Sequence, residues 1–212
     1  MRESGGHNPK REDFLIAMYG QMWQNINRHI LVVWQSVGVL AGAFALLALA
    51  EKQIISLDWA VSFIILIVAW LVGHVLDANG WYNRNLVILS NIERQFLSQA
   101  DLQDVHYYFG KHREDSRLIE QFQLQFGFGV GIAVLVLLYH IWTRVVPGIG
   151  SPISRFDPPR AIPYAVTIIA SVLLYRFWKN QGGSYDTLVQ KSPGIEIGQK
   201  ADSSVPSEKP SD

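Results

Sequence analysis

Four long apolar runs alternate with polar segments along this chain. The first three runs contain no Asp, Glu, Lys or Arg, and the fourth contains only Arg176, near its end. An α-helix rises about 1.5 Å per residue, so roughly 20 apolar residues cross a hydrocarbon core of about 30 Å. The pattern predicts an all-α integral membrane protein with four transmembrane helices, at about residues 30–50, 59–76, 126–143 and 162–178. The fourth run is the shortest, so whether it crosses completely is the open point of this topology.

The polar segment 77–125 separates the second span from the third. Its first half has apolar side chains at a helical spacing of three or four residues, namely Leu86, Leu89, Ile92 and Phe96. This stripe predicts that the second membrane helix continues through Gly80 to about Leu97.

Further helices are expected in the second half of this segment. Ser98 followed by Asp101 has the spacing of a capping box and predicts a new helix, which Gly110 is expected to end. Beyond it, apolar residues step by four into the third apolar run, at Leu118, Phe122 and Phe126. A helix beginning at about Arg113 is therefore expected to enter the membrane without a break.

The two ends of the chain are polar in different ways. Residues 1–29 predict an amphipathic helix whose apolar face would lie on the membrane surface or against a partner helix. Its apolar residues are Leu15, Met18, Met22, Ile26 and Ile30. Residues 180–212 are rich in Ser, Pro, Glu, Lys and Asp, and we expect a disordered tail because they carry little apolar material.

The distribution of charge predicts the orientation in the membrane. With four crossings, 14 of the 18 Lys and Arg residues lie on the side of both termini and the central segment, against four on the other side. Basic residues favour the cytoplasmic side, so both termini should be cytoplasmic, in the plasma membrane or, in a prokaryote, the inner membrane. Trp and Tyr residues near the span ends are typical of an interfacial belt.

Pairs of glycines in two of the spans have the spacing that lets membrane helices approach closely. Gly38 and Gly42 lie in the first span, and Gly127 and Gly131 in the third. We expect close helix packing there, mainly within one chain.

Polar side chains within the spans are candidates for a polar seam, because an unsatisfied polar group in hydrocarbon is costly. They are Gln35, Ser36 and His140. The favoured interpretation is a hydrogen bond from Gln35 to a neighbouring helix and contact of His140 with interfacial water. A pathway for ions or protons is the alternative.

The basic cluster of the central segment has two interpretations. Lys111 and Arg113 could contact anionic lipid headgroups, or they could simply enforce the topology, since Glu114 and Asp115 follow directly. A metal site built from His106, His112 and these two carboxylates is not expected, because the spacing matches no helical zinc motif.

Composition and motifs narrow the function. The net charge is zero, which gives no support for nucleic-acid binding, and the absence of Cys excludes disulfides and thiolate chemistry. No phosphate-binding glycine loop, nucleophile elbow or paired-histidine motif is present, so we predict neither an enzyme nor a cofactor.

The leading hypothesis is a membrane sensor, scaffold or effector that self-associates or binds a protein partner. Its contact surface would be the apolar residues Leu86, Leu89, Ile92, Phe96, Leu118 and Phe122, although these could instead pack on one another within one chain. A pore or transporter with the polar seam is the alternative. A lipid-acting enzyme using His74, Asp77 and His140 is the weakest.

Overall fold

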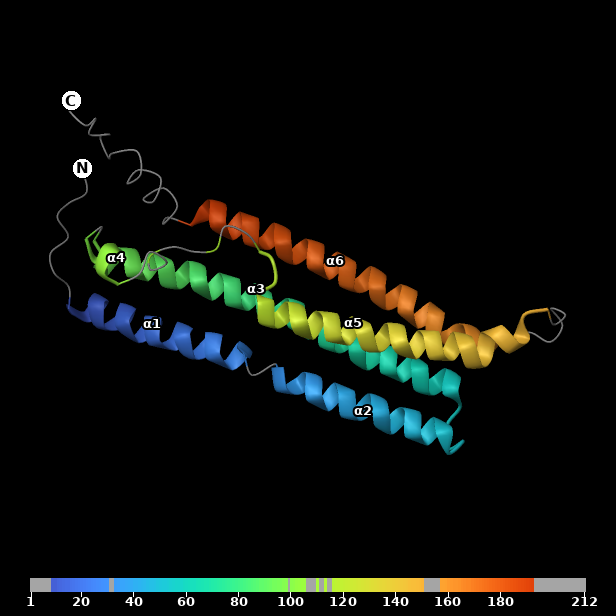
Figure 1. The fold of residues 1–212 in the computed structure, drawn as a ribbon. Helices are drawn as coiled ribbons and strands as arrows, with labels where there is room; N and C mark the ends of the chain where they lie inside the picture. The colour runs from blue at the N-terminus through green and yellow to red at the C-terminus, as the bar shows by residue number, and fades with distance from the viewer. Residues whose placement is uncertain are drawn as a thin grey trace, which may run out of the picture. The chain divides into compact units, whose positions relative to one another are not determined.

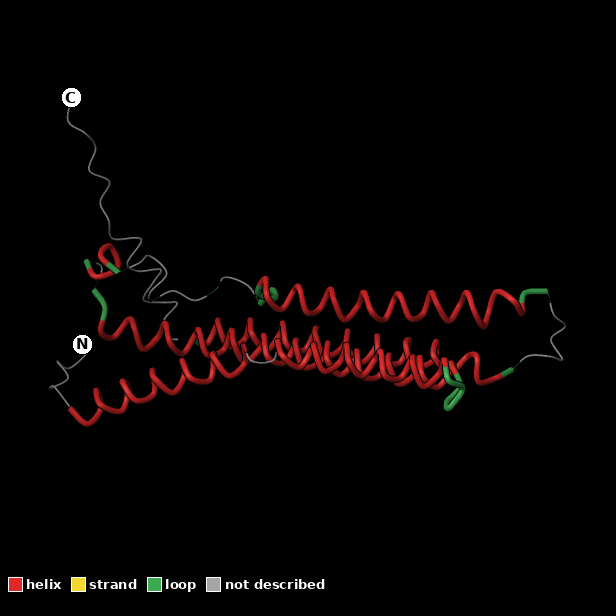
Figure 2. Tube along the Cα trace, turned by 60° about the horizontal axis from the view of Figure 1, so that its bottom comes forward, coloured by secondary structure: helices red, strands yellow, loops and turns green. Residues whose placement is uncertain are grey.

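The structure is a computed structural model that describes residues 9–30, 33–98, 100–105, 110, 113, 116–150 and 157–192. These residues form helices and connecting loops, with no strand among them (Figures 1 and 2). The α-helices are α1 (Pro9–Ile30), α2 (Val33–Glu51), α3 (Leu57–Phe96), α4 (Asp101–Asp104), α5 (Glu120–His140) and α6 (Ile162–Lys191). A π-helical turn, η1 (Ile141–Val145), and a 3-10 turn, η2 (Val146–Gly148), follow α5, and a second 3-10 turn, η4 (Pro158–Ala161), leads into α6.

Three helical stretches are long and apolar enough to cross a membrane. They are Leu57–Phe96, Glu120–Gly148 and Pro158–Lys191. The apolar part of α2, Ser36–Glu51, is shorter. The weakest candidate is therefore the first apolar run, whereas the sequence pointed to the fourth.

The chain divides into two compact units. Unit 1 contains Met1–Arg28, Gly80–Ser116 and Gly182–Asp212, and unit 2 contains His29–Asn79 and Arg117–Gln181. Both α3 and α6 contribute residues to each unit.

In unit 2, α3 is the central helix. Its buried side chains recur every three or four residues, at Val61, Ile64, Val68, Leu71 and Val75. The α5 helix approaches it at Gly129, where an added Cβ would lie 3.6 Å from Val68, Leu71 and Val72. The α6 helix approaches at Gly73, where an added Cβ would lie 3.5 Å from Leu174.

The other helices of unit 2 keep apolar side chains on their outer surfaces. In the most apolar part of Leu57–Phe96, 56% of the residues are buried. This share falls to 22% in the most apolar part of Glu120–Gly148 and to 6% in that of Pro158–Lys191. Large apolar surfaces that are exposed to water are rare in soluble proteins. Three apolar helices with exposed apolar faces are compatible with a membrane protein.

The turn between α2 and α3 is defined by its hydrogen bonds. The amides of Gln53 and Ile54 donate to the carbonyls of Ala50 and Leu49, which is the pairing of a Schellman motif. Gln53 takes the left-handed position, at φ 56°. The next helix begins where Ser56 Oγ accepts from the Trp59 amide at 3.4 Å.

In unit 1, α1 lies along the second half of α3. The Tyr19 hydroxyl donates to Glu93 Oε1 at 2.9 Å, and Arg11 bonds Gln95. Ile26 of α1 and both Leu89 and Ile92 of α3 are buried. The apolar face of the N-terminal helix thus packs on a helix of the same chain.

The residues between α4 and α5 bond α3 at several described positions, including Gly110 and Arg113. Gly110, at φ 72°, donates its amide to Glu93 Oε2 at 2.6 Å, and its carbonyl accepts from Arg94 Nε. The Arg113 side chain donates to Asn83 Oδ1 at 3.0 Å. Gly110 does not end α4 directly, because α4 stops at Asp104.

The structure corrects two sequence expectations. Residues 116–119 are not helical, and α5 begins at Glu120 rather than near Arg113, because Ile119 is extended and its amide donates to Asn79 Oδ1 at 3.4 Å. Residues 180–191 are not disordered, because α6 continues through both glycines to Lys191. Residues 193–212 of the expected tail lie outside the described residues.

Candidate functional site

A buried polar network lies at the end of unit 2 where α3 begins and α5 ends. Asp58, in the first turn of α3, has 2% of its side chain exposed, and His140, the last residue of α5, has 0%. Arg144 comes from η1, Asp157 directly precedes η4, Arg160 lies in η4, and Tyr164 lies in the first turn of α6. The network therefore connects three helices of unit 2.

Asp58 is the centre of this network. Its Oδ1 lies 2.8 Å from His140 Nε2 and accepts from Arg144 Nε at 3.2 Å, and its Oδ2 accepts from Arg144 Nη2 at 2.8 Å. The Arg144 contact is bidentate, which is the strongest geometry for a guanidinium and a carboxylate. A buried carboxylate requires such partners, because the loss of its hydration is costly.

His140 joins this ion pair to α6. Its Nδ1 lies 2.8 Å from the Tyr164 hydroxyl. The neutral tautomer with hydrogen on Nε2 satisfies every contact, since Nε2 then donates to Asp58 and Nδ1 accepts from Tyr164. Tyr164, His140 and Asp58 form a continuous hydrogen-bonded chain.

The outer part of the network balances its charge. Arg144 Nη2 also donates to Asp157 Oδ2 at 3.1 Å, and Arg160 Nε lies 3.3 Å from the same oxygen. These three side chains are about one-third exposed. Two carboxylates face two guanidiniums, so the network is neutral when His140 is neutral. Its clearest chemical role is to hold α3, α5 and α6 together.

The charged residues that flank the apolar runs are a sequence signal for this network, and hydrophobic periodicity does not include them. Asp58 precedes the second apolar run and Arg144 follows the third, while Asp157 and Arg160 precede the fourth. In a four-span topology all of these positions lie on the same side of the membrane. Opposite charges at matching ends of neighbouring spans are the signal that indicates an ion pair.

The proposed polar seam does not form a continuous path among the described residues. His140 is enclosed and bonded to α3 and α6, so the expectation that it reaches interfacial water is wrong. Ser36 is buried near the start of α2. At the other end of α2, Glu51 lines a groove with Tyr139, which is next to His140 in sequence. Ser36 is about 22 Å along α2 from Glu51. The Gln35 side chain lies outside the described residues.

The groups of the lipid-enzyme hypothesis are also separated. His74 stacks on Trp70, with ring centroids 5.4 Å apart, and Asp77 accepts from Gln181 at 3.4 Å. His140 bonds Asp58, about 28 Å along α3 from Asp77. The structure therefore does not bring these three side chains into one site.

The predicted glycine contacts occur at other glycines. An added Cβ at Gly38, Gly42, Gly127 or Gly131 would meet no described atom within 4 Å. Close packing within the chain is found instead at Gly129 and Gly73, as described above. The four predicted glycines face open space in the single chain, so their use between chains stays a prediction.

Most of the predicted contact surface is covered within the chain. Leu89, Ile92 and Phe122 are buried, and Leu86 and Leu118 are half-buried. The physical reason is that α1 covers the stripe on α3, while Phe122 packs inside unit 2. Phe96 alone in this set is exposed, at 48%.

Phe96 borders an apolar groove of unit 1. The cavity has a volume of about 280 Å³ and is lined by Ile16 and Tyr19 of α1, by Ile92, Glu93 and Phe96 of α3, and by Leu97 and Val105. Burial and the neighbouring Glu93 carboxylate raise the pKa of the Tyr19 hydroxyl. Both polar groups of this groove bond each other, so its remaining surface is apolar.

The remaining sequence candidates lie partly outside the described residues. Lys111 is one of these, as are all four residues considered for a metal site. Arg113 is described, and its guanidinium bonds Asn83. Among the described residues no cluster of His, Asp and Glu could hold a metal ion.

Comparison of the chain with protein-family models, with curated proteins and with solved structures finds no match.

Proposed function

We propose that this protein is a four-span membrane protein in which α2, α3, α5 and α6 cross the bilayer. The apolar outer faces of these helices support the proposal, and the sequence extends the apolar run of α2 back to Ile30. The excess of Lys and Arg in the terminal and central segments supports a cytoplasmic location for those segments.

Its proposed role is that of a membrane sensor, scaffold or effector that acts by association, without catalysis. The observation that carries this role is the open apolar groove between α1 and α3 in unit 1. Ile16, Phe96 and Val105 on its border are 63%, 48% and 53% exposed. An apolar groove in an otherwise polar segment is typical of a docking site.

The proposed occupant is a second copy of this chain. The adjacent part of the same α3 stripe already binds an amphipathic helix of this sequence, namely α1. A second copy supplies apolar side chains on that same helix, including Phe14, which is 66% exposed. A symmetric dimer would place the groove of each chain against α1 of the other.

The test is the mass of the purified protein in mild detergent, measured by light scattering with the detergent contribution subtracted. The wild-type chain should be a dimer or larger, and Phe96→Asp should shift it to the monomer because a carboxylate in an apolar interface is costly. Phe14→Asp is excluded as a control, since Phe14 belongs to the proposed contact. Ile54→Asp, in the exposed turn between α2 and α3, should leave the mass unchanged.

A wild-type chain that is strictly monomeric, with no co-purifying protein, would contradict the proposal. A dimer that persists in Phe96→Asp would place the contact elsewhere and would also contradict it.

A further inference from the structure

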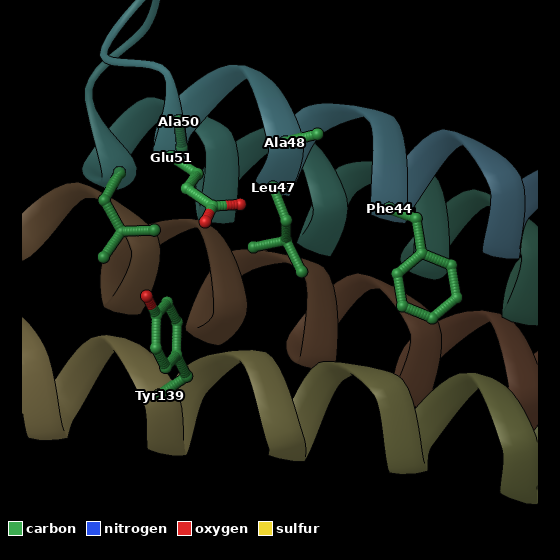
Figure 3. Close-up of a pocket in the computed structure, with 7 residues that line it drawn as sticks. Phe44, Leu47, Ala48, Ala50, Glu51 and Tyr139 are labelled. Atoms are coloured by element: carbon green, nitrogen blue, oxygen red, sulfur yellow. The ribbon is translucent and has the colours of Figure 1, made fainter.

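Unit 2 also contains a groove, which lies at the carboxyl end of α2 (Figure 3). Its volume is about 560 Å³. The α2 side of the groove carries Phe44, Leu47, Ala48 and Glu51, which share one helical face, and Leu57 and Tyr139 complete it from α3 and α5. Figure 3 shows the Phe44, Leu47 and Glu51 side chains projecting from α2 toward α5. The groove is thus apolar along its length and acidic at one end.

Glu51 forms no ion pair among the described residues. It is exposed, and no described Lys or Arg lies within ion-pair distance of its carboxylate. Glu51 is also the last residue of α2, where the helix dipole is negative and disfavours a carboxylate. The end of this groove therefore favours a cation.

Tyr139 adds a second polar group to the same end. Its hydroxyl has no hydrogen-bond partner among the described residues, and the side chain is 53% exposed. A carboxylate and a phenol oxygen together accept hydrogen bonds from a donor that carries several N–H groups.

The aromatic residues around this end of unit 2 indicate its depth in the bilayer. Trp59 at the start of α3 is 49% exposed, and Trp142 just after α5 is 73% exposed. Such rings are enriched at the level of the lipid headgroups. Glu51 lies at the end of an apolar helix, so its carboxylate is expected at the same level.

We propose that this groove binds a phospholipid with a primary ammonium headgroup. The ammonium pairs with Glu51 and the Tyr139 hydroxyl, and an acyl chain lies along Phe44, Leu47 and Ala48. A glycerol headgroup lacks the required cation, and a quaternary choline has no N–H to donate. The proposal depends on the location of α2 in the bilayer and is independent of self-association.

Native mass spectrometry of the full chain tests this preference. The protein is released from mixed micelles that contain ethanolamine, choline and glycerol phospholipids with identical acyl chains at equal concentration. The wild-type chain should retain the ethanolamine lipid about tenfold more than either competitor, as expected for a charge-assisted hydrogen bond. Glu51→Gln should remove this preference, and Glu51→Asp should keep part of it.

Matched controls separate the site from general effects. Glu120→Gln changes another exposed carboxylate at the end of an apolar helix and should keep the preference. Ala48→Trp should fill the groove and reduce retention of the ethanolamine lipid, whereas Ala45→Trp, on an exposed position of α2 that does not line the groove, should not. Circular dichroism in detergent checks that each variant keeps its helices.

Equal retention of the three lipids by the wild-type chain would overturn the proposal. So would an ethanolamine preference that survives both Glu51→Gln and Ala48→Trp. Failure of the chain to fractionate with membranes is measured separately and would instead overturn the proposed membrane location.

Discussion

At the residue scale, Asp58 is the side chain whose loss should cost the most stability. Asp58→Ala removes the acceptor of the buried His140 ring and of the Arg144 guanidinium. Breaking a buried ion pair typically lowers the free energy of unfolding by 3–5 kcal/mol. We expect about 3 kcal/mol, because Arg144 is one-third exposed and regains part of its hydration. Equilibrium unfolding in mixed micelles measures this loss.

Asp157→Ala is the matched control for this prediction. Its carboxylate bonds the same guanidinium but is 37% exposed, so its loss should change the free energy of unfolding by about 0–1 kcal/mol. Losses of the same size in the two variants would show that burial of Asp58 does not determine its contribution.

Asp101 provides a pH-dependent prediction at the same scale. Its Oδ2 accepts from the Ser98 hydroxyl at 2.6 Å and from the Ser98 amide at 2.7 Å, and these bonds lower the pKa of the carboxyl below its usual range. Because this pKa is lower in the folded state than in the unfolded state, the ionised carboxylate stabilises the folded cap at pH values above the unfolded pKa. This contribution is lost as the pH falls through the folded pKa. The pKa is read from the carboxyl carbon shift by NMR.

Ser98→Ala should raise the pKa of Asp101 because it removes the hydroxyl donor. Ser56→Ala is the control, since Ser56 also stands at the start of a helix but bonds Trp59. An unchanged pKa of Asp101 in Ser98→Ala would contradict the capping contact.

At the element scale, periodicity indicated helices well and their ends less well. The stripe from Leu86 to Phe96 follows one face of α3, and α3 runs through Gly80 to Phe96. Periodicity predicts too early a start for α5, because the step of four from Leu118 continues an apolar spacing through residues that are not helical. Contacts of single backbone groups, such as that of Ile119 with Asn79, decide such ends and leave no periodic signal.

The end of α6 shows the opposite error. Composition after Asn180 indicated disorder, but Tyr185 is buried and its hydroxyl donates to the Arg113 carbonyl at 2.6 Å. Ser192 accepts from Asn91 at 2.7 Å. These contacts join residues far apart in sequence, so local composition does not reveal them.

Tyr185→Phe should therefore loosen the last turns of α6. The substitution keeps the ring and removes one hydrogen bond, worth about 1 kcal/mol. Hydrogen exchange in residues 184–191, followed by mass spectrometry, should become about fivefold faster. Thr187→Val, which removes an exposed hydroxyl bonded within α6, should leave exchange much slower than Tyr185→Phe does. Equal acceleration in both variants would contradict an anchoring role of Tyr185.

At the scale of the whole molecule, the sequence indicates helices and their order but not which side chains meet. The all-helical class and the apolar stretches follow from composition and spacing. The Asp58 network depends on which helix ends are neighbours, and the cover of the α3 stripe depends on the return of α1 along it. Both are long-range facts, which periodicity within one segment does not contain.

The topology gives the last prediction, and the absence of Cys makes it direct to measure. Single cysteines at the exposed positions Lys52 and Ile149 should react with a membrane-impermeant thiol reagent on intact cells. Cysteines at Asp13, Ser98 and Lys191 should react only after permeabilisation, because the excess of basic residues favours the proposed cytoplasmic location of their segments.

The pair Asp13 and Lys52 decides whether α2 crosses the membrane. The described apolar part of α2 is shorter than those of the other three helices, so this crossing is the one that structure supports least. Opposite reactivity of the two positions requires a crossing between them. Equal reactivity would leave only three crossings and would place α1 and the Ser98 segment on different sides of the membrane. The contacts of Tyr19 with Glu93 could not then form within one chain, so the same measurement also tests the packing of unit 1.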